Sequence, residues 1–380
     1  MPKVETFGME VEFPIVMFGT YHDWISSFSR IKRDLPGKLY RDATPCSEYA
    51  TSVHDNYDDL VDELLSAFAT ISEATNHNIF FIGKFAQVPA TFSGHIHIGK
   101  REGWKNNEIK KVLRSLHGLQ TLMELLSQNA KGSGLADPRQ PFRDFYRYYP
   151  ISYAGVTREN LNFTWNEHKT VENRIPPSSD FFHLLTLLVI EKAWLNKYNN
   201  RITYDFDINF TNAVKKGLSG QYMIIAGDEV YEVNGYVYVA AMLSKIESEI
   251  KQELKNISQK RRKKVEKYIS FLKRAPLSSV LSSKTTLNLK EMAEKLIYHE
   301  ELFIKGIKFK TIEIPAKKVT EKTIAEIVKA VTHSKQYSSY LKVKSFLKAI
   351  RCNKPELMSS EEDKELVKKV LFSKRLEVII

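Results

Sequence analysis

The sequence predicts an α+β fold, and two kinds of pattern carry the prediction. Short stretches alternate polar and apolar residues with a period of two, which is typical of strands with one exposed face. Longer stretches repeat apolar residues at helical spacing, as residues 55–74 and 107–131 do. Residues 181–195 are mostly apolar but include His183, Glu191 and Lys192, so they predict a buried helix and fall short of a membrane span.

The first predicted strand covers residues 4–18, with an interruption near Pro14. Its alternation places Glu10 and Glu12 on one face and apolar residues on the other. Two acids at this spacing are common on exposed strands, so the pattern is weak when it is taken alone.

Residues 40–52 begin with turn residues and return to an extended run. Asp42 and Glu48 can both reach a site formed by the first strand, although a polar hairpin is the alternative interpretation. A helix is then expected from a cap at Asp55 to about Ala74.

Residues 93–99 read SGHIHIG and predict a strand with both imidazoles on one face. A pair of surface histidines is the simpler interpretation of His95 and His97 on their own. A compact apolar strand is expected before it, at residues 78–85, and a long helix after it, at residues 107–131.

Residues 132–150 have the composition of a long loop, which either forms an active-site wall or packs over a sheet edge. Residues 160–165 and 169–175 predict an antiparallel pair of strands, and the second presents Glu172 and Arg174 on one face.

Three predicted strands thus carry a Glu/Glu, a His/His and a Glu/Arg pair. Such strands can form the walls of one metal and phosphate site.

The back of the chain is basic. Residues 1–240 contain 25 Lys+Arg and 28 Asp+Glu, a net charge of −3, whereas residues 241–380 contain 32 and 17, a net charge of +15. A hairpin is expected at residues 217–233, and the lysine–arginine run at 260–264 is interpreted as a solvated helix face. We expect two domains, residues 1–306 and a basic, mainly helical piece at residues 307–380.

Four stretches resemble, in order, motifs of the glutamine synthetase-like carboxylate–amine ligases, in particular the glutamate–cysteine ligase and amidoligase branches. They read FGMEVEF, RDATPCSEYAT, SGHIH and TVENRIP, and they begin at residues 7, 41, 93 and 170. A weaker match follows at residues 213–220. The chain departs from the family pattern at Asn173, which replaces a usually apolar residue, and at Thr44 and Pro177-Ser178.

The resemblance implies a curved antiparallel sheet, a half-barrel backed by helices, whose concave face binds ATP and Mg²⁺ or Mn²⁺. It implies that Glu12 and Glu48 hold the ion next to the acceptor carboxylate. The ion that bridges the phosphates is assigned to the side chains of Glu10, His95 and Glu172.

The remaining implied roles concern phosphate contacts and orientation. Arg174 would neutralise the transferring phosphoryl group, and Arg158 is a weaker candidate for a second phosphate contact. His97 either orients a ligand or is itself a ligand.

Two other functions compete with an amide-forming ligase. A metal-dependent hydrolase would use the histidines with Glu10 and Glu12, but the sequence has no HExxH helix and a hydrolase gives Arg174 no task. A catalytically silent relative would bind nucleic acid or an acidic protein through its basic back half, and no recognition motif accompanies that charge.

Substrates and surroundings are predicted only in outline. The expected substrates are ATP, a small glutamate-like carboxylate and an amine, with a peptide or protein substrate as an alternative. Two cysteines, Cys46 and Cys352, make no disulfide framework, so a cytoplasmic protein is expected, with no membrane partner. A homo-oligomer is compatible with the resemblance.

Overall fold

The computed structural model describes most of the first 272 residues and short pieces beyond them. The described ranges are 4–17, 20–41, 46–79, 92–128, 163–165, 169–178, 181–198, 203, 205, 207–226, 229–272, 286–288 and 311–313, with single residues between 356 and 368. In this part of the chain no helix has the length and apolar character needed to cross a membrane.

A six-stranded antiparallel sheet forms the first half of the molecule, with strand order β4-β5-β1-β6-β8-β7. The strands are β4 (Lys38–Arg41), β5 (Ser47–Ala50), β1 (Thr6–Phe13), β6 (Gly94–Gly99), β8 (Val171–Asn173) and β7 (Phe163–Trp165). The predicted α+β class and antiparallel sheet are confirmed, and the half-barrel curvature stays a prediction.

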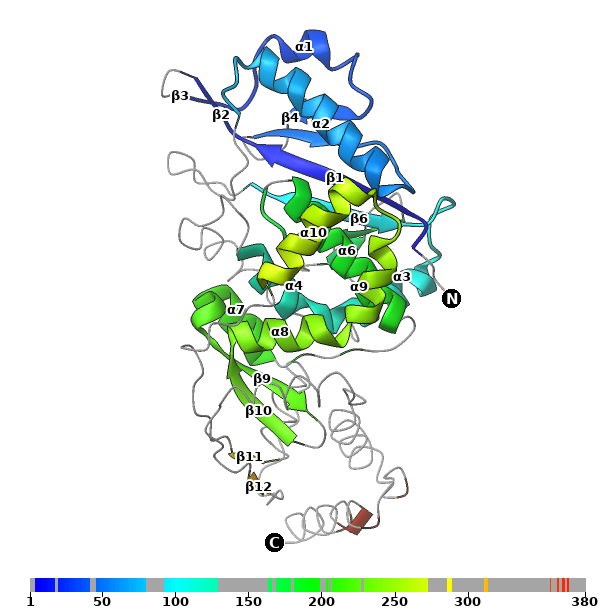
Figure 1. Ribbon diagram of the computed structural model, residues 1–380, viewed down its shortest axis with the longest axis vertical. Coiled ribbons are helices and arrows are strands. Elements are labelled where there is room, and N and C mark those ends of the chain that lie inside the picture. The colour runs from blue at the N-terminus through cyan, green and yellow to red at the C-terminus, as the bar shows by residue number, and fades with distance from the viewer. Residues whose placement is uncertain are drawn as a thin grey trace, which may run out of the picture.

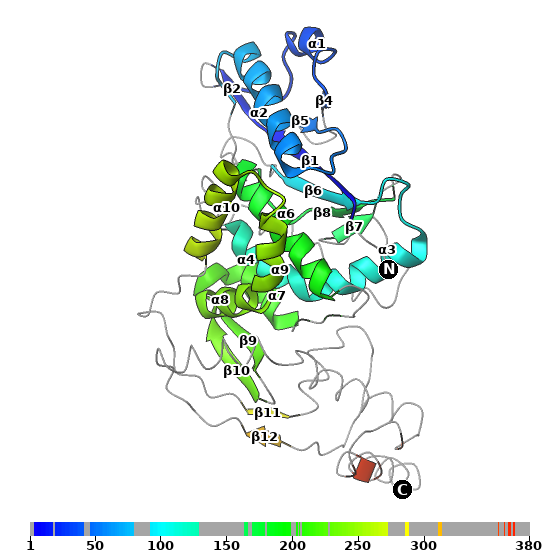
Figure 2. The same ribbon diagram turned by 45° about the vertical axis from the view of Figure 1, so that its right-hand side comes forward.

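One face of this sheet is apolar and packs on helices. Phe7 stacks on Tyr57 and Phe13 meets Phe68 edge to face, so α2 (Tyr57–Ala74) covers β1. Helix α6 (Phe181–Tyr198) is the helix predicted from the apolar run, and it packs against both α2 and β6. Figures 1 and 2 show β1, β4 and α2 at one end of the described molecule.

The first predicted strand is interrupted where Pro14 removes a backbone donor. Strand β1 ends at Phe13, and β2 (Ile15–Met17) turns away to pair with β3 (Thr20–His22). A short helix, α1 (Phe28–Ile31), follows. Of the strand expected at 78–85, only its first two residues lie within the described part, where Ile79 bridges to Ile15.

The cap of α2 lies one residue later than predicted. Asn56 Oδ1 accepts hydrogen bonds from the backbone nitrogens of Asp58 and Asp59, at 2.7 and 3.4 Å. Asp55 was the expected cap, but its carboxylate pairs with Arg101. Both residue types suit a cap, so only the structure separates them.

The long helix predicted at 107–131 is divided. It consists of α3 (Asn106–Leu116), a 3₁₀ turn at His117–Leu119 and α4 (Gln120–Gln128). The hydroxyl of Thr203 accepts from Gly118 N at 2.8 Å and donates to Ser115 O at 2.7 Å. This side chain from a distant segment satisfies backbone groups at the break, and glycine there weakens the helix.

The second half of the described chain contains the predicted hairpin and most of the remaining helices. Its elements in order are α7 (Asp207–Lys216), a 3₁₀ turn (Gly217–Ser219), β9 (Gln221–Ala226), β10 (Glu229–Asn234), α8 (Gly235–Lys245), α9 (Glu247–Leu254) and α10 (Gln259–Leu272). Figure 1 shows the β9–β10 hairpin beyond α8, at the opposite end from β1. Strand β11 (Thr286–Asn288) pairs with β12 (Thr311–Glu313) across the boundary expected at residue 306, which stays a prediction.

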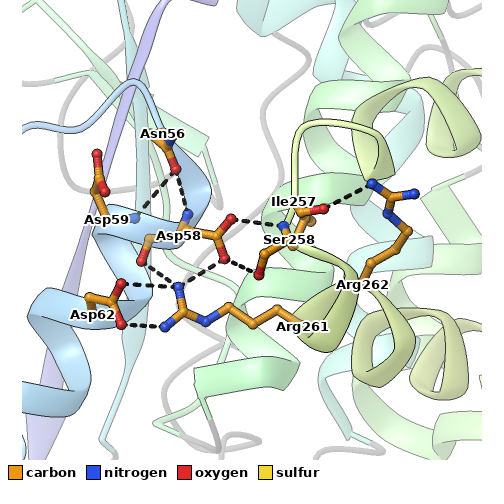
Figure 3. Close-up of polar contacts among 8 residues, drawn as sticks. All are labelled: Asn56, Asp58, Asp59, Asp62, Ile257, Ser258, Arg261 and Arg262. Atoms are coloured by element: carbon orange, nitrogen blue, oxygen red, sulfur yellow. Dashed lines mark hydrogen bonds and ion pairs between the residues drawn. The ribbon is translucent and has the colours of Figure 1, made fainter.

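Arg261 joins α10 to α2 (Figure 3). Its Nη1 lies 2.8 Å from Asp58 Oδ1, and its Nη2 pairs with Asp62. Ser258 donates to the Asp58 carboxylate from its backbone nitrogen at 2.8 Å and from its hydroxyl at 2.7 Å. The predicted solvated helix face is therefore wrong for the arginines, because Arg262 also turns inward, to Ile257 O at 3.0 Å.

We expect Arg261→Met to lower the free energy of unfolding by about 1–2 kcal/mol, because it leaves two carboxylates without their guanidinium. Lys263→Met removes a charge from an exposed position of the same helix and is expected to change stability by less than about 0.5 kcal/mol. Urea denaturation measures both variants. Equal stability of the two would show that the Arg261 contacts contribute nothing.

Candidate functional site

The strand register brings six polar side chains to one face of the sheet. Glu12 lies opposite Glu48, Glu10 lies opposite His95, and His97 lies opposite Glu172. Directly paired residues of antiparallel strands point to the same face, and residues two apart along a strand share that face. All six therefore face away from α2 and α6.

Gly94 allows β6 to lie close to helix α6 on the face of the sheet opposite the polar side chains. A Cβ on Gly94 would lie 2.8 Å from Leu184 Cδ2 on α6 and 2.9 Å from Pro177 O. Only glycine lets the strand approach α6 this closely. The glycine before His95 in the sequence motif is thus a packing requirement.

Two histidines and two acids form one contact cluster. His95 Nδ1 lies 3.2 Å from Glu10 Oε2 and 3.2 Å from Glu172 Oε1. His97 Nε2 also lies 3.2 Å from Glu10 Oε2. Glu10 is therefore shared by both imidazoles, and His95 lies between the two carboxylates.

The other two acids lie beside this cluster and each has a hydrogen-bond donor. Glu12 Oε2 accepts from the backbone nitrogen of Ser93 at 2.6 Å, and Glu48 Oε1 accepts from the Tyr40 hydroxyl at 2.7 Å. Tyr40 lies opposite Glu48 in the register, which is why its hydroxyl reaches the carboxylate. Glu12, Glu48, His95 and Glu172 are all buried.

The crowding of acids shifts their ionisation. Burial and the nearby Glu10 raise the pKa of Glu48 to about 8. Burial lowers the pKa of His95, but the hydrogen bond to Glu10 and the charge of Glu172 outweigh it and raise the value to about 9. Burial also raises the pKa of Glu10, and its contacts with the two histidines reverse this and lower it well below the ordinary range.

Arg174 lies at the margin of the cluster. Its Nε is 3.5 Å from Glu172 Oε1, and 39% of its side chain is exposed, so the guanidinium can meet an incoming anion. Arg158, the second candidate phosphate contact, lies outside the described residues, as do Asp42 and the loop expected at 132–150.

The donor set fits a hard divalent cation. One ligand atom each from Glu10, His97 and Glu172 lie within 4.8 Å of one another. Carboxylates with imidazole and without thiolates suit Mg²⁺ or Mn²⁺. Burial and then the charge of Glu10 raise the pKa of Glu48, and a cation there would offset the second effect. His97 joins the candidate ligands on geometry, beside the predicted His95.

Sequence reasoning missed the side chains that support this face from outside the motifs. Tyr40 carries no signal by itself, because its place opposite Glu48 depends on the hairpin register. Glu191 also lies outside the motifs, and it accepts a hydrogen bond at 2.8 Å from the motif residue Asn173 on the opposite face of β8. The sequence hints at this pair through the departure at Asn173 and through Glu191, an acid within the apolar run at 181–195.

No protein-family model matches this chain, and no curated protein sequence matches it. The structure is similar to the Pup ligase PafA, solved in complex with prokaryotic ubiquitin-like protein Pup, with 10% identity and a TM-score of 0.42 over 99% of this chain and 95% of that chain. It is also similar to glutamate–cysteine ligase from Francisella tularensis in complex with AMP, with 10% identity and a TM-score of 0.43 over 99% of both chains.

We expect Mg²⁺ to bind more tightly as the pH rises from 7 to 9 and to release protons. Both His95, with a pKa of about 9, and Glu48, with a pKa of about 8, must lose a proton to become ligands. Calorimetry in two buffers of different ionisation enthalpy measures the proton release.

Stability gives a second readout of the same groups. Both pKa values lie above their unfolded values, so the stability that these groups contribute is complete at low pH. It is lost progressively as the pH rises above the unfolded values toward 8 for Glu48 and 9 for His95. Mg²⁺ should therefore raise the melting temperature more at pH 9 than at pH 7. A larger shift at pH 7 would contradict the assignment of His95 and Glu48.

Proposed function

We propose that the protein is an ATP-dependent carboxylate–amine ligase that acts on a glutamate-like carboxylate. The observation that carries the proposal is the gathering of Glu10, Glu12, Glu48, Glu172 and the two histidines on one face of one antiparallel sheet. These residues come from four separate stretches that resemble ligase motifs. Their convergence is therefore expected of a ligase and is not required by the apolar core.

The proposed reaction has two steps. The acceptor carboxylate attacks the γ-phosphorus of ATP, which forms an acyl phosphate and releases ADP. The amine then attacks the acyl carbon, phosphate leaves, and the amine nitrogen loses a proton to give the amide. No step needs a nucleophile from the protein, so the catalytic demand is positioning and charge neutralisation.

The acids divide the face into two parts. Glu12 and Glu48 would hold an ion at the acceptor carboxylate, and Glu10, Glu172 and a histidine would hold an ion at the phosphates. Bound Mg²⁺ or Mn²⁺ would neutralise phosphate charge and draw the two substrates together. Ser93 N and Tyr40 orient the first pair of acids through hydrogen bonds of 2.6 and 2.7 Å.

Arg174 has a task in this reaction that it lacks in a hydrolase. Its planar guanidinium suits the charge that spreads over the phosphoryl oxygens during transfer. The contact with Glu172 at 3.5 Å keeps it beside the proposed phosphate ion. A catalytically silent relative is disfavoured because the four acids that the resemblance assigns to metal ions, Glu10, Glu12, Glu48 and Glu172, all lie on this face.

The identities of the acceptor carboxylate and of the amine are the next part of the proposal. A small glutamate-like acid and a peptide or protein side chain both fit the proposed chemistry, since the reaction involves only the carboxylate. The basic piece after residue 306 would contact an acidic partner, whether a protein, a nucleic acid or a second copy of the chain.

ADP formation in the presence of Mg²⁺ tests the proposal with panels of carboxylates and amines. We expect ADP release to require a carboxylate, and hydroxylamine to trap the acyl phosphate as a hydroxamate. ATP hydrolysis that no carboxylate stimulates would indicate a different reaction. Lack of ADP formation with every pair would favour the silent relative.

Arg174→Lys keeps the charge and loses the planar fork, so we expect kcat to fall about 100-fold while the Kd for ATP changes by less than about threefold. Arg101→Lys is the matched control, because Arg101 is an exposed residue paired with Asp55 outside the site. Steady-state kinetics and nucleotide titration measure the two effects. An unchanged kcat would show that Arg174 has only a structural role, as the ion-pair partner of Glu172.

A further inference from the structure

The strand that carries Glu172 ends in a polar residue on its buried face. Asn173 is fully buried and lies opposite Ile96, on the side of the sheet that packs against the helices. A buried amide group is costly unless it is hydrogen-bonded. The chain also departs from the ligase motif at this position, where an apolar residue is usual.

Both ends of the Asn173 amide are bonded. Its Nδ2 donates to Glu191 Oε2 on α6 at 2.8 Å, and its Oδ1 accepts from the backbone nitrogen of Ile175 at 3.1 Å. The second bond spans two residues and closes an Asx turn. Arg174 is the residue enclosed by this turn, so the Asn173 side chain restrains the backbone from which the guanidinium projects.

Glu191 determines which way the amide points. Glu191 Oε2 accepts a hydrogen bond from Asn173 Nδ2. The amide oxygen of Asn173 is then oriented to accept from the backbone nitrogen of Ile175. Burial raises the pKa of Glu191 to about 8, although the bond from Asn173 opposes the shift. Burial therefore favours the neutral form of Glu191, and within the described part of the chain no group hydrogen-bonds to its buried Oε1.

Helix α6 is a firm support for this bond. It packs against α2, α3, α9, α10 and β6, and its Leu184 contacts Gly94 directly before His95. The same helix thus fixes the strand with the histidines and, through Glu191, the strand with Glu172. Helix α6 therefore holds both β6, which carries the two histidines, and β8, which carries Glu172.

We propose that Asn173 is a positioning residue for Glu172 and Arg174, and that Glu191 orients its amide for this purpose. The alternative is a buried polar pair that only stabilises the fold. The inference rests on the proposed function where the readout is metal binding or turnover, and is independent of it where the readout is the backbone at residues 173–175.

Three variants separate positioning from stability. Glu191→Gln keeps an oxygen acceptor in a neutral group of the same shape, whereas Glu191→Leu and Asn173→Leu remove the bond. Thr186→Val is the matched control, because Thr186 is a buried residue of the same helix whose hydroxyl donates to Phe182 O at 2.6 Å and does not reach β8.

The full chain is titrated with Mn²⁺ at a temperature where every variant is folded, and amide hydrogen exchange is followed at Ile175. We expect Asn173→Leu and Glu191→Leu to weaken Mn²⁺ binding about tenfold or more and to speed exchange at Ile175. Glu191→Gln and Thr186→Val should bind Mn²⁺ within about twofold of the unchanged chain, even if Thr186→Val unfolds as easily as the leucine variants.

Mn²⁺ binding by both leucine variants at the level of Thr186→Val would overturn the proposal and leave a structural pair. If the unchanged chain neither binds Mn²⁺ nor forms ADP, the proposed function fails, and exchange at Ile175 still decides the role of Asn173. Asn173→Leu removes the acceptor of the Ile175 N–H itself, so Glu191→Leu is the informative variant. Faster exchange in Glu191→Leu than in Thr186→Val then supports positioning, and equal exchange overturns it.

Discussion

The register of β1 between β5 and β6 is the constraint on which the rest of the structure depends. It places Glu12 opposite Glu48 and Glu10 opposite His95, while Phe7, Met9 and Val11 point to the helices and are almost fully buried. A shift of one residue would turn the acids into the core. Because burying each large apolar side chain contributes about 1.5–3 kcal/mol, the core holds this register against the repulsion among the acids.

A cation on the polar face would offset that repulsion, and buried acids support the strands from behind. The raised pKa values of Glu48 and His95 show that the fold alone favours a proton at each. Behind β5, the buried Glu63 of α2 accepts from the Tyr49 hydroxyl at 2.7 Å and pairs with His54 at 2.7 Å. Behind β8, Glu191 of α6 does the same for Asn173. The strands that flank the central pair are thus each bonded to a helix by a buried acid.

The sequence predicts the faces of this site better than its contacts. Period-two alternation was enough to group Glu10 with Glu12 and His95 with His97, because side-chain direction is a local property of a strand. Register is set between strands, so the Tyr40–Glu48 bond and the approach of His97 to Glu10 were not predictable. Gly118 is only a weak local signal of the helix break, whose backbone groups are satisfied by Thr203, 85 residues away.

Asn173 stands where the ligase motif usually has an apolar residue, and the reason lies in the positions of neighbouring side chains more than in the stability of the fold. A buried polar pair can often be exchanged for two apolar residues at little cost in stability, whereas removal of one partner alone is expensive. Stability by itself therefore gives no reason for an amide and a carboxyl group between β8 and α6. The Asx turn gives one, since an apolar side chain cannot accept a hydrogen bond from Ile175 and so cannot restrain the backbone of Arg174. A strand of only three residues has few ladder bonds with which to fix the residue that follows it. The side chain of Asn173 supplies that restraint at the point where the proposed reaction needs a guanidinium in one place.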